Sequence, residues 1–169
     1  PVTDWKNFGG ITRDVHLVRV PTTYISTYSI QLESSDIIKA NISLSGAEIN
    51  HREVTVRIPE LGVLVTGKTD SDGNITVKVK TPEDMKFWAP RNPMLYEVIV
   101  STADETVSDR IGFRTIESVD GEILLNGDPI FLRGISIHEE ALGATPNRAT
   151  NKASARALLS IAKSDLNAN

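Results

Sequence analysis

The sequence predicts an all-β protein, with an immunoglobulin-like β-sandwich at its centre and a short β/α tail at its end. Between residues 24 and 117, apolar and polar residues alternate in about seven short runs, as half-buried strands require. Turn-forming residues separate these runs at the spacing that is typical of a sandwich. After residue 140 the strand pattern stops, and a loop is followed by one segment with helical periodicity.

A strand-like pattern already lies before the sandwich. Residues 4–20 begin with two aromatic residues and the pair Gly9-Gly10, and then alternate with Val15 and Leu17 on one face. Pro21 interrupts the pattern. Because one strand without partners is not a domain, we do not count this segment among the strands of the sandwich.

The strands of the sandwich follow in order. The clearest strands have an apolar residue at every second position, so that one face is buried and the other is exposed to solvent. The predicted strands lie within residues 24–33, 36–46, 53–58, 62–67, 75–80, 94–101 and 106–117. Asp72-Gly73 predicts a hairpin turn before the fifth of them. Residues 81–93 contain three prolines and are predicted to be a loop, whose Phe87 and Trp88 pack into the end of the sandwich.

The stretch 109–140 contains the change of architecture. Asp120-Gly121 and Asn126-Gly127 predict two tight two-residue turns, because both pairs tolerate the positive φ angles of such turns. The apolar run 129–137 predicts a buried strand that ends at the polar residues 138–140. Beyond a loop at 141–150, Asn151 is predicted to cap a helix over residues 152–166. A strand, a loop and a helix form one β/α unit, which cannot bury its own apolar faces.

Composition excludes several classes of function. The 169 residues carry a net charge of -4 without any basic run, so we expect neither a nucleic-acid nor a membrane partner. The absence of cysteine removes disulfides and thiolate metal sites, and the isolated His16 and His51 lack the spacing of metal ligands. We therefore expect no metal site, and we expect that the ends of the chain are cut from a longer protein. The compartment, cytoplasm or periplasm, stays open.

Four segments of the sequence resemble glycoside hydrolase family 2, and most closely its bacterial β-galactosidases. They are DWKNFGGITRDVHLV at 4–18, FWAPRNPMLYEV at 87–98, DRIGFRTIE at 109–117, and GEILLNGDPIFLRGISIHEE at 121–140. The resemblance implies that residues 1–20 end a jelly-roll sugar-binding domain and that 21–117 form the immunoglobulin-like sandwich. It further implies that residues 118–169 are the truncated start of a TIM-barrel catalytic domain.

The resemblance also implies roles for individual residues in a full-length parent that hydrolyses β-galactosides. His138 matches a histidine that contacts the bound sugar at the end of the first barrel strand, where catalytic groups of such barrels sit. Glu139 would orient His138 or meet solvent. Asp4 aligns with an aspartate that contacts galactose and a sodium ion in related enzymes. We expect no cofactor in this segment itself, and sodium or magnesium in the parent.

The two catalytic carboxylates of a retaining glycosidase are not expected here. The family's first catalytic glutamate follows an asparagine, and no Asn-Glu pair occurs in the sequence. The neighbours Glu139 and Glu140 would point to opposite sides of a strand, so they could not flank one glycosidic bond. We therefore predict no catalytic residue and no activity for this segment, with the sandwich acting as a spacer between the sugar-binding and catalytic domains.

Two alternatives remain open from the sequence. The parent could be a β-glucuronidase or a β-mannosidase of the same family. The sandwich could instead be a stand-alone module that binds carbohydrate or protein, although only 5% of the residues are aromatic. Without the rest of a barrel, the apolar residues of the tail at 118–169 predict self-association or disorder of that tail.

Overall fold

The computed structural model describes residues 10–11, 14–137 and 151–169. The chain divides into two compact units, of which one is Arg19–Ile130 and the other combines Pro1–Val18 with Phe131–Asn169. Each unit is described by itself below. No helix in the described ranges is long and apolar enough to cross a membrane.

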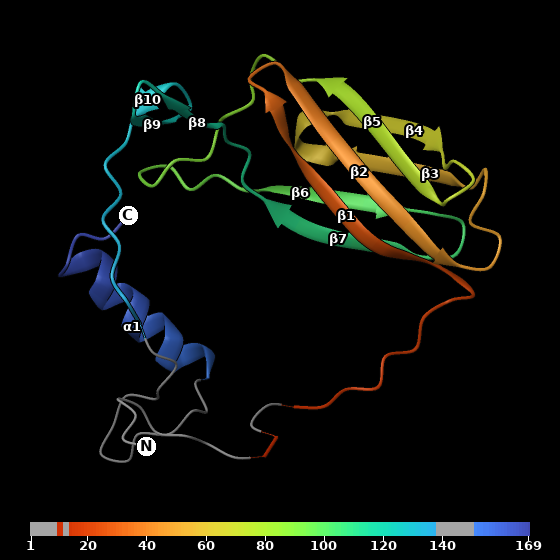
Figure 1. Ribbon diagram of the computed structural model, residues 1–169, viewed down its shortest axis with the longest axis horizontal. Helices are drawn as coiled ribbons and strands as arrows, with labels where there is room; N and C mark the ends of the chain where they lie inside the picture. Colours follow the sequence, from red (N-terminus) through yellow and green to blue (C-terminus); the bar gives the residue numbers. More distant parts are fainter. Residues whose placement is uncertain (1–9, 12–13, 138–150) are drawn as a thin grey trace. The chain divides into compact units, whose positions relative to one another are not determined.

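The larger unit contains a β-sandwich of two antiparallel sheets (Figure 1). The first sheet has the order β1-β2-β5, formed by β1 (Thr23–Ser34), β2 (Ile37–Gly46) and β5 (Asn74–Lys80). The second has the order β4-β3-β6-β7, formed by β3 (Glu53–Ile58), β4 (Val63–Lys68), β6 (Tyr96–Ser101) and β7 (Thr106–Ile111). A short 3-10 turn, η1 (Pro59–Leu61), connects β3 to β4. Two facing sheets of three and four antiparallel strands confirm the predicted all-β, immunoglobulin-like class.

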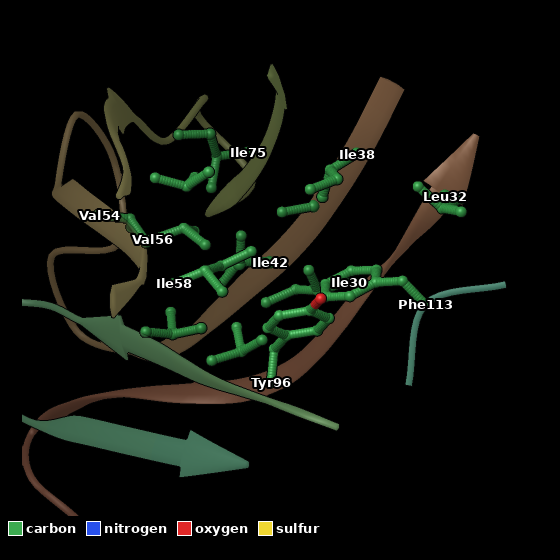
Figure 2. Close-up of a cluster of buried hydrophobic side chains, with 14 of the residues drawn as sticks. Ile30, Leu32, Ile38, Ile42, Val54, Val56, Ile58, Ile75, Tyr96 and Phe113 are labelled. Atoms are coloured by element: carbon green, nitrogen blue, oxygen red, sulfur yellow. The ribbon is translucent and has the colours of Figure 1, made fainter. Parts of the chain in front are cut away.

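The core lies between the two sheets, as Figure 2 shows. In β2, Ile38, Ala40, Ile42 and Leu44 are buried, while the residues between them face outward, as the period-two pattern predicts. β3 and β6 supply the opposite side with further buried valine and isoleucine residues, Val54, Val56, Ile58, Val98 and Val100. Each such side chain stabilises the fold by about 1.5–3 kcal/mol when it is fully buried.

The pairing of β2 with both of its neighbours is fixed by this core. Ile42 lies opposite Tyr28 of β1 and opposite Ile75 of β5. A slip of one residue would turn Lys39 and its outward neighbours into the core and bring the isoleucines to the surface. The register is therefore specified by the alternation that the sequence shows.

The turn at Asp72-Gly73 differs from the prediction. It does not close a hairpin, because β4 pairs with β3 in one sheet and β5 pairs with β2 in the other. The chain crosses between the sheets here, and the Asp70 carboxylate accepts hydrogen bonds from the backbone N–H groups of Asp72 (2.9 Å) and Asn74 (2.8 Å). The acidic side chain thus shapes a crossing loop.

The predicted strand 106–117 is split in the structure. β7 ends at Ile111, and β8 (Ile116–Val119) begins a separate small sheet of order β10-β9-β8. β9 (Glu122–Leu125) and β10 (Asp128–Pro129) complete this sheet. Both predicted two-residue turns are confirmed, since Asp120, Gly121, Asn126 and Gly127 all have positive φ.

The smaller unit contains the helix α1 (Lys152–Ser164). Its predicted cap is confirmed, because the Asn151 side chain accepts a hydrogen bond from Ser154 N at 2.9 Å. The predicted strands at 4–20 and 129–137 are not formed in the described part of these segments, where residues 14–18 and 130–137 are irregular. A strand needs a neighbouring strand for its backbone groups, whereas the backbone groups of Phe131 and Arg133 bond to Asn169. Their apolar side chains, among them Leu17 and Phe131, are exposed.

Candidate functional site

The residues predicted to contact a sugar lie outside the described residues. Asp4, His138 and Glu139 are all in this position, and so is Glu140. Their predicted roles, and the sodium or magnesium ion expected in the parent, therefore stay predictions. In the described ranges, no group of three or more His, Cys, Asp or Glu side chains could hold a metal ion.

What the structure does bring together is the connection between the sandwich and the β8–β9–β10 sheet. Three of the four sequence segments that carry the family resemblance meet there, namely 87–98, 109–117 and 121–140. We call this site the Trp88 junction, and it consists of Trp88, Gly112, Phe113, Arg114, Thr115 and Asn126.

The junction is anchored in the core of the sandwich. Trp88 N donates a hydrogen bond to Phe113 O at 2.8 Å, and the Phe113 side chain is 1% exposed. The Phe113 ring packs against Tyr96 of β6, with 6.1 Å between the ring centroids. Tyr96 in turn accepts a hydrogen bond on its hydroxyl oxygen from Lys86 N at 2.8 Å, which fixes the loop before Trp88. Figure 2 shows Tyr96 and Phe113 side by side at one end of the core.

The indole of Trp88 packs directly against the backbone at Gly112. A Cβ atom at Gly112 would lie 2.7 Å from Cδ1 of Trp88, so only glycine permits this contact. Arg114 lies over the indole ring, with 5.2 Å between its Cζ atom and the ring centroid, and its Nη1 donates to Gly112 O at 2.9 Å. The loop residue Trp88 therefore pairs with Phe113 just beyond the end of the β6–β7 ladder, where Tyr96, the first residue of β6, lies opposite Ile111.

The side chain of Asn126 ties the small sheet to the sandwich. Its Oδ1 accepts a hydrogen bond from Thr115 N at 3.1 Å, and its Nδ2 donates to Trp88 O at 3.0 Å. The backbone N–H of Asn126 donates to Thr115 O at 3.0 Å. One side chain thus joins three segments that are distant in sequence. Sequence reasoning identified Asn126 only as a turn residue, because its long-range partners leave no local signal.

A groove of about 450 Å³ lies beside the junction, between β1 and residues 111–117. Glu33 lies on its rim and binds Lys78 (2.6 Å) and Lys39 (3.4 Å). The hydrogen bond from Lys78 is the largest cause that lowers the pKa of the Glu33 carboxyl. A general acid in glycoside hydrolysis requires a raised pKa, so Glu33 is unsuited to that role.

The fold and the junction define an immunoglobulin-like module to which the β8–β9–β10 sheet is attached. The sequence pattern of the family described as "Glycosyl hydrolases family 2" matches residues 18–114, which is more than half of the chain. The chain belongs to this family, as the resemblance of its sequence segments predicted.

Individual relatives agree with this assignment. A β-galactosidase of Actinobacillus pleuropneumoniae is 34% identical over 140 residues, which cover 80% of this chain and 13% of the relative. A solved β-galacturonidase of this family from Eisenbergiella tayi has a TM-score of 0.67 at 22% identity, covering 89% of this chain and 28% of that one. A solved β-glucuronidase from Ruminococcus gnavus has a TM-score of 0.65 at 21% identity, covering 89% and 25%. At such identities the two structures show the fold alone.

Proposed function

We propose that this chain is a non-catalytic part of a retaining β-galactosidase, in which the sandwich is a spacer that orients a sugar-binding domain against a catalytic barrel. The observation that carries the spacer role is the Trp88 junction, because it holds the β8–β9–β10 sheet, which leads to the following part of the chain, on the sandwich. The 34% identity to the Actinobacillus β-galactosidase supports the choice of substrate. The chain spans only 13% of the length of that relative, so the larger part of such an enzyme would lie elsewhere.

The proposal predicts that the 169-residue chain hydrolyses no β-galactoside. Retention requires two carboxyl groups roughly 5–5.5 Å apart on rigid elements, one of them with a raised pKa. An assay of the purified chain with a chromogenic β-galactoside tests this prediction. Turnover that disappears in Glu139→Gln or Glu140→Gln would contradict it, because the catalytic carboxylates would then be present.

The spacer role can be tested in a chimera. In the Actinobacillus β-galactosidase, the homologous segment would be replaced by this chain, and β-galactosidase activity would be measured. We expect an active chimera that loses activity with Asn126→Ala and keeps it with the matched turn variant Asp120→Ala. A chimera that is folded and active with all three sequences would contradict an orienting role of the junction.

The same chimera tests the residues proposed to contact the sugar. His138→Ala and Asp4→Ala should lower kcat/KM by about tenfold or more, since each removes a polar contact to the substrate. Glu139→Gln should have a smaller effect if it orients His138. Unchanged kcat/KM in the His138 and Asp4 variants would remove these residues from the proposal, while leaving the spacer role untouched.

A parent with another sugar specificity is the second candidate. A β-glucuronidase and a β-galacturonidase share the fold of this chain at 21–22% identity, so the fold is common to enzymes with different sugar specificities. Assays of the full-length parent on β-galactosides, β-glucuronides and β-mannosides would decide. A preference for either of the last two would replace β-galactosidase in the proposal.

A stand-alone binding module would use the groove beside β1. Phe113, the aromatic residue of that groove, is buried and offers no platform on which a sugar could stack. We expect no heat of binding when a panel of glycans is titrated into the chain by calorimetry. Saturable binding would favour the module over the spacer.

Self-association is proposed for the tail. Phe131 is 79% exposed, and Leu132, Leu159 and Leu166 are each more than half exposed. Because such apolar surface mediates association, sedimentation velocity should show oligomers that dissociate when Phe131 and Leu132 are changed to serine. A monomer at all concentrations would contradict this proposal.

A further inference from the structure

Asn126 precedes Gly127 in the only Asn-Gly pair of the sequence. An asparagine before glycine is the pair most prone to intramolecular deamidation, because glycine has no side chain to hinder the approach of its amide nitrogen. We propose that Asn126 is a modification site, which is deamidated only in molecules whose Trp88 junction has opened. The product then releases the β8–β9–β10 sheet from the sandwich.

The reaction needs nothing but water. The backbone nitrogen of Gly127 attacks Cγ of Asn126, a N–Cγ bond forms, and the bond from Cγ to Nδ2 breaks. Ammonia leaves with the proton that Gly127 N gives up, and a succinimide ring remains in the main chain. Water then opens the ring at either carbonyl and yields aspartate or isoaspartate at position 126.

The junction holds the Asn126 side chain away from this reaction. Both ends of the amide are occupied, Oδ1 by Thr115 N and Nδ2 by Trp88 O, so Cγ cannot turn toward Gly127 N without breaking them. The turn itself is fixed as well, with φ of 54° at Asn126 and 86° at Gly127. The rate of deamidation is therefore the intrinsic rate multiplied by the fraction of molecules with an open junction.

The product cannot restore the hydrogen bond to Trp88 O. A carboxylate at position 126 has no N–H group, so an anionic oxygen would face Trp88 O in place of the donor Nδ2. Isoaspartate also adds a methylene group to the main chain of a two-residue turn, which shifts the pairing of Leu125 with Asp128. Deamidation is irreversible, so the fraction of molecules in which the small sheet is separated from the sandwich increases with time.

The neighbouring turn shows that this arrangement is specific. Asp120-Gly121 has the same positive φ angles, yet in the described part of the chain the Asp120 side chain makes no hydrogen bond. Asp120 has no amide to lose as ammonia. Of two similar turns in one small sheet, only the one that carries the reactive amide is held by long-range hydrogen bonds.

The first experiment measures where deamidation starts. The 169-residue chain would be aged in mildly alkaline buffer, and Asn126 conversion followed by peptide mapping with mass spectrometry and isoaspartate labelling. Gly112→Ala displaces Trp88 locally, whereas Val98→Ala, in the buried core away from the junction, lowers global stability. We expect conversion in Gly112→Ala about tenfold faster than in Val98→Ala when both are compared at conditions of equal global stability.

Equal rates in these two variants would overturn the proposal, because deamidation would then follow global unfolding. If Gly112→Ala does not fold, Arg114→Ala replaces it, since it removes both the cation over Trp88 and the bond to Gly112 O. A peptide of residues 121–131 supplies the unprotected rate. Conversion of wild-type Asn126 as fast as in this peptide would also overturn the proposal.

The second experiment tests the consequence. Asn126→Asp imitates one product, and amide hydrogen exchange would be measured by NMR. We expect faster exchange at Thr115 and in β8 and β9, with unchanged exchange in β2, β3 and β6. Wild-type protection of Thr115 in Asn126→Asp would contradict the release of the small sheet.

Discussion

The sandwich and the β8–β9–β10 sheet are built from the same kind of strand but are held in different ways. In the sandwich, each sheet covers the other, and core side chains such as Ile58 are fully buried. In the small sheet, Ile116 (65% exposed), Val119 (46%) and Ile123 (39%) remain open to solvent. The sandwich is stabilised by many interchangeable apolar contacts. The small sheet depends on a few polar contacts at the Trp88 junction, so single substitutions there should have local and specific effects.

The largest effect on stability is expected at Phe113, which belongs both to the core of the sandwich and to the Trp88 junction. Phe113→Ala should lower the free energy of unfolding by about 3–5 kcal/mol, because it empties a buried site next to Tyr96. Leu64→Ala, at a side chain that is 67% exposed, should change it by less than about 0.5 kcal/mol. Urea denaturation followed by circular dichroism measures both. Similar values for the two variants would contradict the position of Phe113 in the core.

Gly112→Ala should have the next largest effect. Its new Cβ would lie 2.7 Å from Cδ1 of Trp88, so the indole must move, at a cost of about 1–3 kcal/mol. In a Trp5→Phe background, Trp88 is the only tryptophan, and its fluorescence should shift to longer wavelength. Gly134→Ala is the control, because a Cβ there meets no atom within 4 Å. An unchanged Trp88 spectrum in Gly112→Ala would show that the indole does not pack on this glycine.

The two turns of the small sheet offer a matched comparison. Asn126→Ala and Asp120→Ala both place alanine at a positive φ, so the backbone strain cancels between them. Only Asn126→Ala removes two long-range hydrogen bonds, and it should be less stable than Asp120→Ala by about 1–2 kcal/mol. Urea denaturation monitored by Trp88 fluorescence gives the difference. Equal free energies of unfolding in the two variants would mean that the hydrogen bonds of the Asn126 amide do not stabilise the protein.

The smallest effect concerns the exposed ion pairs of the sandwich. The pKa of Glu33 is lowered from its ordinary value of 4.5, chiefly by the hydrogen bond from Lys78. A carboxyl with a lowered pKa in the folded state adds stability above pH 4.5 and loses it as the pH falls through that lowered pKa. Glu33→Gln should remove this part of the pH dependence, and Lys78→Met should weaken it, because Lys39 still pairs with Glu33. Identical slopes of stability against pH in the wild type and both variants would contradict the pairing.

The sandwich could be predicted from the sequence because each of its strands carries its own signal. Alternation in segments such as 36–46 reports a half-buried strand without knowledge of its neighbours, and Asp120-Gly121 and Asn126-Gly127 report their turns directly. The N-cap at Asn151 is equally local. What these signals share is that the physical cause lies within a few residues of the effect.

The remaining features depend on contacts between distant segments. Residues 106–117 read as one strand, but β7 ends at Ile111, opposite the first residue of β6, and Trp88 packs on the glycine that follows. Alternation cannot assign β4 and β5 to different sheets either. The apolar run 129–137 predicts a strand, but in the described residues after β10 the backbone groups of Phe131 and Arg133 bond to Asn169 and not to a neighbouring strand.

The candidate site also has features that the sequence indicated and features that it could not indicate. The family segments indicated the right part of the chain, and the roles of Asp4, His138 and Glu139 stay predictions because these residues lie outside the described part. The link between Asn126, Thr115 and Trp88 could not be predicted, since an asparagine in a tight turn has a sufficient local reason to be there.

The most direct test of the Trp88 junction is the exchange rate of one amide hydrogen. Thr115 N donates to Oδ1 of Asn126, so its exchange, measured by NMR, reports whether the small sheet is held on the sandwich. We expect slow exchange at Thr115 in the wild type and in Asp120→Ala, and fast exchange in Asn126→Ala, with the amides of β2 and β6 unchanged in all three proteins. Slow exchange at Thr115 in Asn126→Ala would contradict the account.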